Sequence, residues 1–198
     1  MTDSHDYPRT QPDGEHLVYE TPWWDFYDDD ITDPDGTPGK YSWIRNHSGR
    51  DAVMTIPVTP SGNYLLIKVY RQPTKRYLWE FLAGVMDDGE SPLEAAHREL
   101  AEETGVAATR IELLGFQIPV AGYAGNIFHS FVAEIPEISL DDVNLQADQG
   151  IVDSKLLSRR EWIVLIDREE VGDGVMLTCL ARYWMRQELE TAEPRGDV

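Results

Sequence analysis

The stretch GVMDDGESPLEAAHRELAEETGV, residues 84–106, decides the fold of this chain. It carries the signals that start and stop a helix. Ser91 can cap the helix, Pro92 suits its first turn, and Glu94 can complete a capping box with Ser91. Gly105 stands where a residue in the left-handed conformation commonly ends a helix. The pattern predicts a helix of roughly 13 residues between Ser91 and Gly105.

This helix has two chemically distinct faces. At about 100° per residue, apolar and small side chains line up on one face, which we expect to pack on a sheet. That face carries Leu93, Ala96, Leu100 and Thr104. An adjoining arc gathers three carboxylates, those of Glu99, Glu102 and Glu103.

Three carboxylates this close repel one another, and a divalent cation removes the repulsion. Hard oxygen ligands favour Mg²⁺, or Mn²⁺, over Zn²⁺. An acidic arc alone is more often the solvated face of an amphipathic helix. Here Gly84, Glu90, Arg98 and Gly105 stand in fixed register with the glutamates. The whole pattern therefore predicts a metal site.

Composition narrows the classes of partner. The net charge is −19, from 36 acidic against 17 basic residues, and no basic patch stands out. Nucleic-acid backbones and anionic membranes are therefore poor partners. A small anion complexed with Mg²⁺ stays compatible, because the metal supplies local positive charge.

The chain shows no signal of export or of membrane insertion. No apolar run approaches a membrane span, and the N-terminus lacks a basic-then-apolar pattern. The single cysteine, Cys179, lies among apolar residues, which predicts a buried thiol and excludes a disulfide within the chain. We expect a cytoplasmic protein.

Patterning along the chain predicts an α/β/α sandwich around a mixed β-sheet. Residues 1–14 are expected to be disordered, 15–50 to form an N-terminal antiparallel β extension, 51–190 the main domain, and 191–198 a flexible tail. Strands are expected at 52–58, 63–70, about 110–119 and about 126–135, before a polar acidic loop at about 137–150. Two helices are expected at about 158–168 and 174–190.

The skeleton from Gly84 to Val106 matches the Nudix box, and the chain is identified as a member of the Nudix hydrolase superfamily. Tyr70-Arg71-Gln72, followed by Leu78-Trp79-Glu80 and Ala83-Gly84, resembles the ADP-ribose pyrophosphatase branch. That branch hydrolyses ADP-ribose or related nucleoside diphosphate sugars to a nucleoside monophosphate and a sugar phosphate. The resemblance also implies a homodimer whose N-terminal strands help to build the partner's active site.

Carried over by position, the resemblance implies roles for particular residues. Glu99 and Glu103 would be the principal ligands of Mg²⁺, Glu102 a ligand or the base, and the Ala83 carbonyl a further ligand. Arg71 and Glu80 fall where the family places polar groups that face the substrate. Arg98 is expected to brace the glutamates, because its guanidinium fork can hold a carboxylate in one orientation.

The general base is less well defined. ADP-ribose enzymes commonly carry a catalytic glutamate in a later loop, and the corresponding stretch here offers only Asp148. Asp148 is therefore a candidate base, although a loop aspartate is more often a turn residue. The alternatives are Glu102, Glu134 and Glu137.

Several aromatic residues have two interpretations. Trp23, Trp24 and Trp43 lie in the N-terminal segment, which in this branch helps to bind the adenine, and an indole can stack on a base. They could instead cover the sheet or a dimer interface. Tyr123 stands near a position where ADP-ribose enzymes often have proline and dinucleoside polyphosphate hydrolases tend to have tyrosine.

The first reading is thus a Mg²⁺-dependent pyrophosphohydrolase of ADP-ribose or another nucleoside diphosphate sugar. Alternatives are a hydrolase of dinucleoside polyphosphates or other nucleotides, and a non-catalytic Nudix domain that senses a nucleotide sugar. The complete box and the lack of a basic extension disfavour the sensor. The histidines show no metal-ligand spacing, and we assign them no catalytic role.

Overall fold

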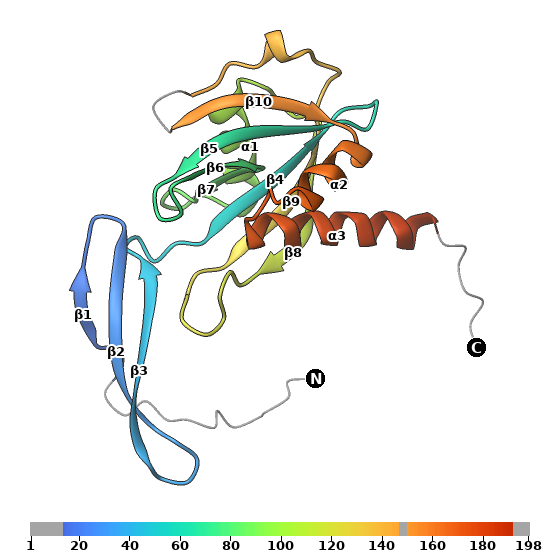
Figure 1. Ribbon diagram of the computed structural model, residues 1–198. Coiled ribbons are helices and arrows are strands. Elements are labelled where there is room, and N and C mark those ends of the chain that lie inside the picture. Colours follow the sequence, from blue (N-terminus) through green and yellow to red (C-terminus); the bar gives the residue numbers. More distant parts are fainter. Residues whose placement is uncertain (1–13, 147–149, 192–198) are drawn as a thin grey trace, which may run out of the picture. The chain divides into compact units, whose positions relative to one another are not determined.

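The computed structural model describes residues 14–146 and 150–191 (Figure 1). The chain forms two compact units. The N-terminal unit contains the residues through Arg50 together with Ile118–Asn126, and the second unit contains Asp51–Gln117 and the chain from Ile127 onward.

The N-terminal unit is an antiparallel sheet of three strands in the order β1-β2-β3. The strands are β1 (Leu17–Glu20), β2 (Trp24–Thr32) and β3 (Pro38–Asn46). The turn between β2 and β3 is closed by a hydrogen bond from the Asp33 N–H to the Thr37 carbonyl at 2.9 Å. Gly36 adopts a positive φ of 86° in this turn, a conformation that glycine takes without a Cβ penalty.

The segment Ile118–Asn126 belongs to this unit because it is hydrogen-bonded to β3. The Ile44 N–H donates to the Tyr123 carbonyl at 2.8 Å, and the Gly125 N–H donates to the Ile44 carbonyl at 2.9 Å. The Asn46 N–H donates to the Asn126 side chain at 2.7 Å. The connection between Gln117 and Ile127, which both belong to the second unit, is thus part of the N-terminal unit.

The second unit is built on a mixed sheet whose main path runs β10-β5-β4-β9-β8. β4 and β9 are parallel and the other neighbours are antiparallel. Two short strands lie off this path, β6 against β5 and β7 against β4. The strands are β4 (Ala52–Val58), β5 (Tyr64–Arg71), β6 (Arg76–Glu80), β7 (Leu82–Val85), β8 (Arg110–Gln117), β9 (Phe128–Glu134) and β10 (Ile151–Leu157).

Helices cover both faces of this sheet, which confirms the predicted α/β/α sandwich (Figure 1). They are α1 (Pro92–Thr104), α2 (Arg159–Asp167) and α3 (Gly174–Thr191), with a 3-10 turn, η1, at Leu140–Asp142. Alternate residues of β4 serve the two layers. Val53 packs in a cluster with Ala95 and Ala96 of α1, whereas Met54 packs in a cluster with residues of α2 and α3.

Two details differ from the sequence-based expectation. Leu93, placed on the buried face of the helix, is 45% exposed, because it lies in the first turn of α1, while Ala95 is fully buried. The strand β10 was not expected at all. Its polar residues, such as Asp153 and Lys155, break the apolar pattern, and the strand is defined by its pairing with β5.

Candidate active site

The box helix α1 is positioned by the signals found in the sequence. The Ser91 hydroxyl accepts the N–H of Glu94, and the Glu94 carboxylate accepts the N–H of Ser91, so the capping box forms as predicted. Gly105 ends the helix in the left-handed conformation with φ 71°. The helix therefore begins directly after the loop that leaves β7, and this geometry brings its glutamates to the β7 backbone.

Gly84 of β7 lies directly beside one of these glutamates. A Cβ atom added at Gly84 would lie 1.9 Å from Oε1 of Glu99. No side chain other than hydrogen fits there while Glu99 keeps its place. The glycine is thus required by the close approach of the Glu99 carboxylate to the strand.

Arg98 donates hydrogen bonds to three carboxylates, and those to Glu99 and Glu102 agree with the bracing role expected for it. Its Nε and Nη2 donate to the two oxygens of Glu90, both at 2.9 Å. Its Nη1 donates to Glu99 at 2.7 Å and to Glu102 at 3.1 Å, and Nη2 also reaches the Val85 carbonyl at 3.1 Å. The hydrogen bonds that Arg98 donates to Glu90, followed by those to Glu99 and Glu102, raise the pKa of Arg98 above its ordinary value.

Glu103 is the least satisfied group of the box. The residue is 4% exposed, and its Oε2 is buried without a hydrogen-bond partner in the described part of the chain. Burial, followed by the charge of Glu99, raises the pKa of Glu103 to about 8. Burial also raises the pKa of Glu99. A buried carboxylate oxygen with no donor is costly, and a cation beside it would remove the cost.

The three box glutamates do not converge on one point. Glu99 and Glu103 are buried, whereas the side chain of Glu102 is 45% exposed. Arg98 donates hydrogen bonds to Glu99 and Glu102, whereas Ala83 and Arg71 are among the groups that lower the pKa of Glu103. The donor set fits a hard divalent cation, since it consists of carboxylate oxygens and an adjacent backbone carbonyl.

Arg71 and Glu80 form an ion pair next to the box. The Arg71 Nε donates to both oxygens of Glu80, at 2.9 and 3.1 Å, and Nη2 donates to Oε2. Glu80 is 3% exposed, while the Arg71 side chain is 48% exposed. The hydrogen bonds that Arg71 donates to Glu80 raise the pKa of Arg71. Glu80 therefore fixes the guanidinium through Nε and Nη2, while Nη1 donates no hydrogen bond to any residue in the described ranges.

A pocket of about 200 Å³ adjoins this ion pair. It is lined by Ala52, Met54, Arg71, Glu80, Ala83, Gly84, Val85, Phe128, Asp173 and Val175. Sequence reasoning did not find Phe128, Asp173 or Val175. Asp173 directly precedes α3, and its position in the sequence indicates only a helix cap. No sequence signal therefore links Asp173 to the box.

Two of the alternative bases, Glu134 and Glu137, lie away from the box helix. Asp148 falls outside the described residues. Glu134 pairs with Val58 at the far end of β4 and is 3.8 Å from Arg110. Glu137 accepts hydrogen bonds from the backbone and hydroxyl of Ser61. The structure therefore does not bring Glu134 or Glu137 to the box helix.

The three tryptophans lie in the N-terminal unit and differ in environment. Trp23 and Trp24 are 76% and 43% exposed. Trp43 stacks on Tyr27 with ring centroids 4.2 Å apart, and its Nε1 donates to Asp29 at 2.6 Å. One face of Trp43 is thus already occupied by a ring of its own sheet.

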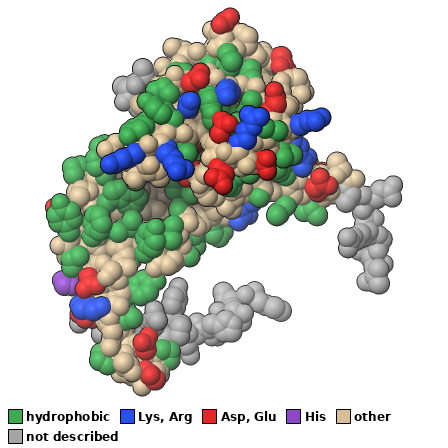
Figure 2. Space-filling model, in the orientation of Figure 1, with side chains coloured by type: hydrophobic (Ala, Val, Ile, Leu, Met, Phe, Trp, Pro, Cys, Tyr) green, Lys and Arg blue, Asp and Glu red, His purple; other side chains and the backbone are tan. Residues whose placement is uncertain are grey.

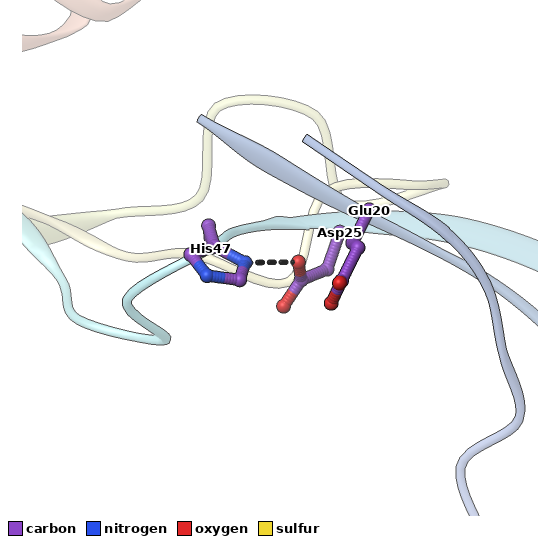
Figure 3. Close-up of side chains that lie close together, drawn as sticks. All are labelled: Glu20, Asp25 and His47. Atoms are coloured by element: carbon purple, nitrogen blue, oxygen red, sulfur yellow. Dashed lines mark hydrogen bonds and ion pairs between the residues drawn. The ribbon is translucent and has the colours of Figure 1, made fainter. Parts of the chain in front are cut away.

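The N-terminal unit also brings together Glu20, Asp25 and His47, whose ligand atoms lie within 4.8 Å of one another (Figure 3). The His47 Nδ1 is 2.7 Å from Asp25 Oδ1. This hydrogen bond, with the charge of Asp25, raises the pKa of His47. The hydrogen bond between His47 and Asp25, with the charge of Glu20 nearby, accounts for the cluster.

Comparison with known proteins identifies the family of this chain. The NUDIX domain family matches residues 49–177, and the chain belongs to this family. It is a Nudix hydrolase of pyrophosphate bonds, related at modest identity to ADP-ribose and sugar-nucleotide pyrophosphatases.

Relatives cover most of the chain. An ADP-ribose pyrophosphatase of Bacillus subtilis is 29% identical over 84% of this chain and 88% of its own length. A methanol dehydrogenase activator of Bacillus methanolicus is 35% identical over 82% of this chain and 85% of its own. The solved structure of an ADP compounds hydrolase superposes with a TM-score of 0.74 at 21% identity, covering 89% of this chain and 93% of that chain. This last likeness supports the fold.

Proposed function

We propose that this protein hydrolyses the pyrophosphate bond of ADP-ribose or a related nucleoside diphosphate sugar. The products would be a nucleoside monophosphate and a sugar phosphate. The observation that carries the proposal is the buried, partnerless oxygen of Glu103 beside Glu99, in a box where Gly84 gives the second carboxylate its space. Similarity to an ADP-ribose pyrophosphatase and to a GDP-mannose pyrophosphatase of Yersinia enterocolitica, 28% identical over 78% of this chain, supports the substrate class.

Mg²⁺ is the cofactor of this proposal, with Mn²⁺ as a substitute. The residues that would hold it are Glu99, Glu102, Glu103 and the Ala83 carbonyl. When bound, such an ion neutralises the phosphate oxygens and lowers the pKa of a water molecule. The chain's own contribution is to keep oxygen ligands close to the β7 backbone in fixed orientations.

Arg98 and Arg71 have separate tasks in this proposal. Arg98 positions Glu99 and Glu102 through one nitrogen, Nη1, while Glu90 holds the rest of the guanidinium. Arg71, fixed by Glu80, would contact a phosphate oxygen through Nη1. Glu102, the exposed carboxylate of the box, would accept the proton of the attacking water, with Asp148 as the alternative base.

The N-terminal sheet would form a homodimer in this proposal. Figure 2 shows hydrophobic side chains gathered over this sheet. Those exposed are Leu17, Val18, Tyr19, Trp23, Trp24 and Phe26. Contiguous exposed apolar surface commonly marks an interaction site. Trp23 or Trp24 could then stack on the adenine, whereas Trp43 would stay within the sheet.

We further propose that the protein binds neither nucleic acid nor anionic membranes, on the basis of its charge of −19. A cytoplasmic location is proposed because a single cysteine excludes a disulfide framework within the chain. Among the described helices, none has the length and apolar character that crossing a bilayer requires.

The test is Mg²⁺-dependent turnover of ADP-ribose beside GDP-mannose, ADP-glucose, NADH and diadenosine polyphosphates, with Glu103→Gln as control. Release of AMP from ADP-ribose that is lost in the variant would support the proposal. Preference for diadenosine polyphosphates would replace the substrate class and leave the box in place. Binding of nucleotide sugars without turnover of any compound would contradict hydrolysis and favour a sensor.

A further inference from the structure

The pocket beside the Arg71–Glu80 pair lies where the sheet splits. β4 and β5 are neighbours, but their ladder is reduced to the pair Val58–Tyr64. Farther along, β5 pairs with β6 over residues 67–71, and β4 pairs with β7 over residues 52–55. The split leaves a pocket of about 200 Å³ that reaches the backbone of Ala83 and Gly84, on the strand that faces the box glutamates.

The walls of this pocket differ in chemistry. Its apolar lining residues include Met54, Phe128, Val175 and Ala52. Its charged lining residues are Arg71 with its partner Glu80, and Asp173. Apolar side chains combined with a few polar groups are the usual composition of a small-molecule site.

Asp173 is held in position by the helix that follows it. Its Oδ1 accepts the N–H of Met176 at 2.7 Å, and its carbonyl accepts the N–H of Leu177 at 3.1 Å. Its Oδ2 accepts no hydrogen bond from any residue that the structure describes. The negative charge of Asp173 also contributes to raising the pKa of Arg71. The helix cap thus fixes one oxygen and leaves the other to a ligand.

The chemical group that binds in this pocket must be small and must be compatible with the carboxylate of Asp173. A carboxylate repels phosphate, so the phosphates belong on the side of Arg71 and the box. The group attached directly to a phosphate in a nucleoside diphosphate sugar is a sugar, and a base is one ring farther away. The volume is below the roughly 300 Å³ at which pockets for whole drug-sized ligands begin. A sugar that ends in the pocket fits, whereas a nucleoside ribose would have to carry its base onward.

We infer that Asp173 is a specificity-determining residue, whose free Oδ2 accepts hydrogen bonds from hydroxyls of the terminal sugar of the substrate. This inference rests on the proposed function. Phe128, Met54 and Val175 contact the C–H face of the sugar, and Arg71 contacts the phosphate that carries it. Asp173 takes no part in bond cleavage, and its effect is confined to substrates with a hydroxylated group at that end.

The experiment compares the wild-type protein with Asp173→Ser and Asp173→Asn. Serine and asparagine both cap helices well, so the start of α3 is kept, but the serine hydroxyl is too short to reach the ligand. Asp142→Ser, which removes an exposed aspartate of η1, is the matched control. Each variant is assayed with ADP-ribose and with the P2-methyl ester of ADP, a pyrophosphate without a terminal sugar. Inhibition by ribose 5-phosphate and the Tm are measured in parallel.

For Asp173→Ser we expect kcat/KM for ADP-ribose to fall about 10-fold to 100-fold, the effect of losing a hydrogen bond to a charged group. The loss should lie in KM. The Ki of ribose 5-phosphate should rise by a similar factor, while the methyl ester and the Tm change little. Asp173→Asn, which keeps an acceptor oxygen, should be intermediate, and Asp142→Ser should match the wild type.

Equal losses on both substrates would overturn the inference and assign Asp173 a structural role. So would a wild-type protein that treats ADP-ribose and the methyl ester alike. If the wild type hydrolyses no pyrophosphate at all, the proposed function fails. Calorimetry with ribose 5-phosphate then decides the inference separately: weaker binding to Asp173→Ser supports it, and equal binding overturns it.

Discussion

Replacing Glu103 by glutamine should stabilise the metal-free protein while removing its activity. The pKa of Glu103 rises from 4.5 to about 8, mainly because the carboxyl is buried. Between these values the folded protein keeps a proton that the unfolded chain has released. The stability contributed by the protonated carboxyl is therefore complete below pH 4.5 and is lost as the pH rises toward 8.

The size of the effect follows from the pKa difference. At about 1.4 kcal/mol per unit, the full difference corresponds to about 5 kcal/mol. The ionised carboxylate can turn partly toward water, so we expect about 2 to 3 kcal/mol at pH 8. Glutamine has nearly the same shape and never ionises. In a chain of this length the change should raise the Tm by about 5 to 10 °C.

Thermal unfolding with a chelator present, at pH 5 and pH 8, measures this effect. Glu102→Gln is the control, because the Glu102 side chain is 45% exposed and its removal relieves no buried charge. Glu103→Gln should match the wild type at pH 5 and exceed it at pH 8. Added Mg²⁺ should stabilise the wild type and have little effect on this variant. A variant less stable than the wild type at pH 8 without metal would refute the reasoning.

Three further substitutions test the scaffold. Gly84→Ala should lower kcat about 100-fold with little change in Tm, since the flexible Glu99 side chain can swing away from the new Cβ but then leaves its position; a variant of normal activity would contradict the required close approach. Arg98→Lys should weaken Mg²⁺ activation about 10-fold to 100-fold, because an ammonium cannot hold the carboxylates that the fork holds, and unchanged Mg²⁺ titrations would oppose this. Gly125→Ala should destabilise the N-terminal unit by about 1 to 3 kcal/mol, because its Cβ would lie 2.8 Å from the Trp43 ring; near-ultraviolet circular dichroism during denaturation reports the loss.

Local signals were the part of the fold that the sequence predicted best. Ser91, Glu94 and Gly105 define the ends of α1 because capping depends on residues a few positions apart. Leu93 was misplaced because helical periodicity says which residues share a face, but not where along the helix the sheet begins to cover it. The sequence did not predict β10 because polar residues such as those of β10 are compatible with an edge strand and with a loop alike.

The residues of the site also differ in whether local sequence predicts them. The box glutamates and Arg98 lie within one helix, so their spacing is visible in the sequence. Asp173 lines the pocket beside the box from 70 positions beyond Glu103, through the packing of α3 on the sheet. Nothing local to Asp173 distinguishes this cap from the others. Contacts of that kind follow from tertiary structure alone.

The path of Ile118–Asn126 limits how the chain can be divided. Because this segment is hydrogen-bonded to β3 but is encoded between β8 and β9, the two units are joined by three stretches of chain. Deletion of the residues through Arg50 would remove Ile44, the backbone hydrogen-bond partner of Tyr123 and Gly125. The nine-residue segment Ile118–Asn126 would then lose these hydrogen bonds to β3. The N-terminal unit is therefore built from two separate segments of the chain. An exchange of this unit between relatives requires the exchange of the segment through Arg50 together with Ile118–Asn126.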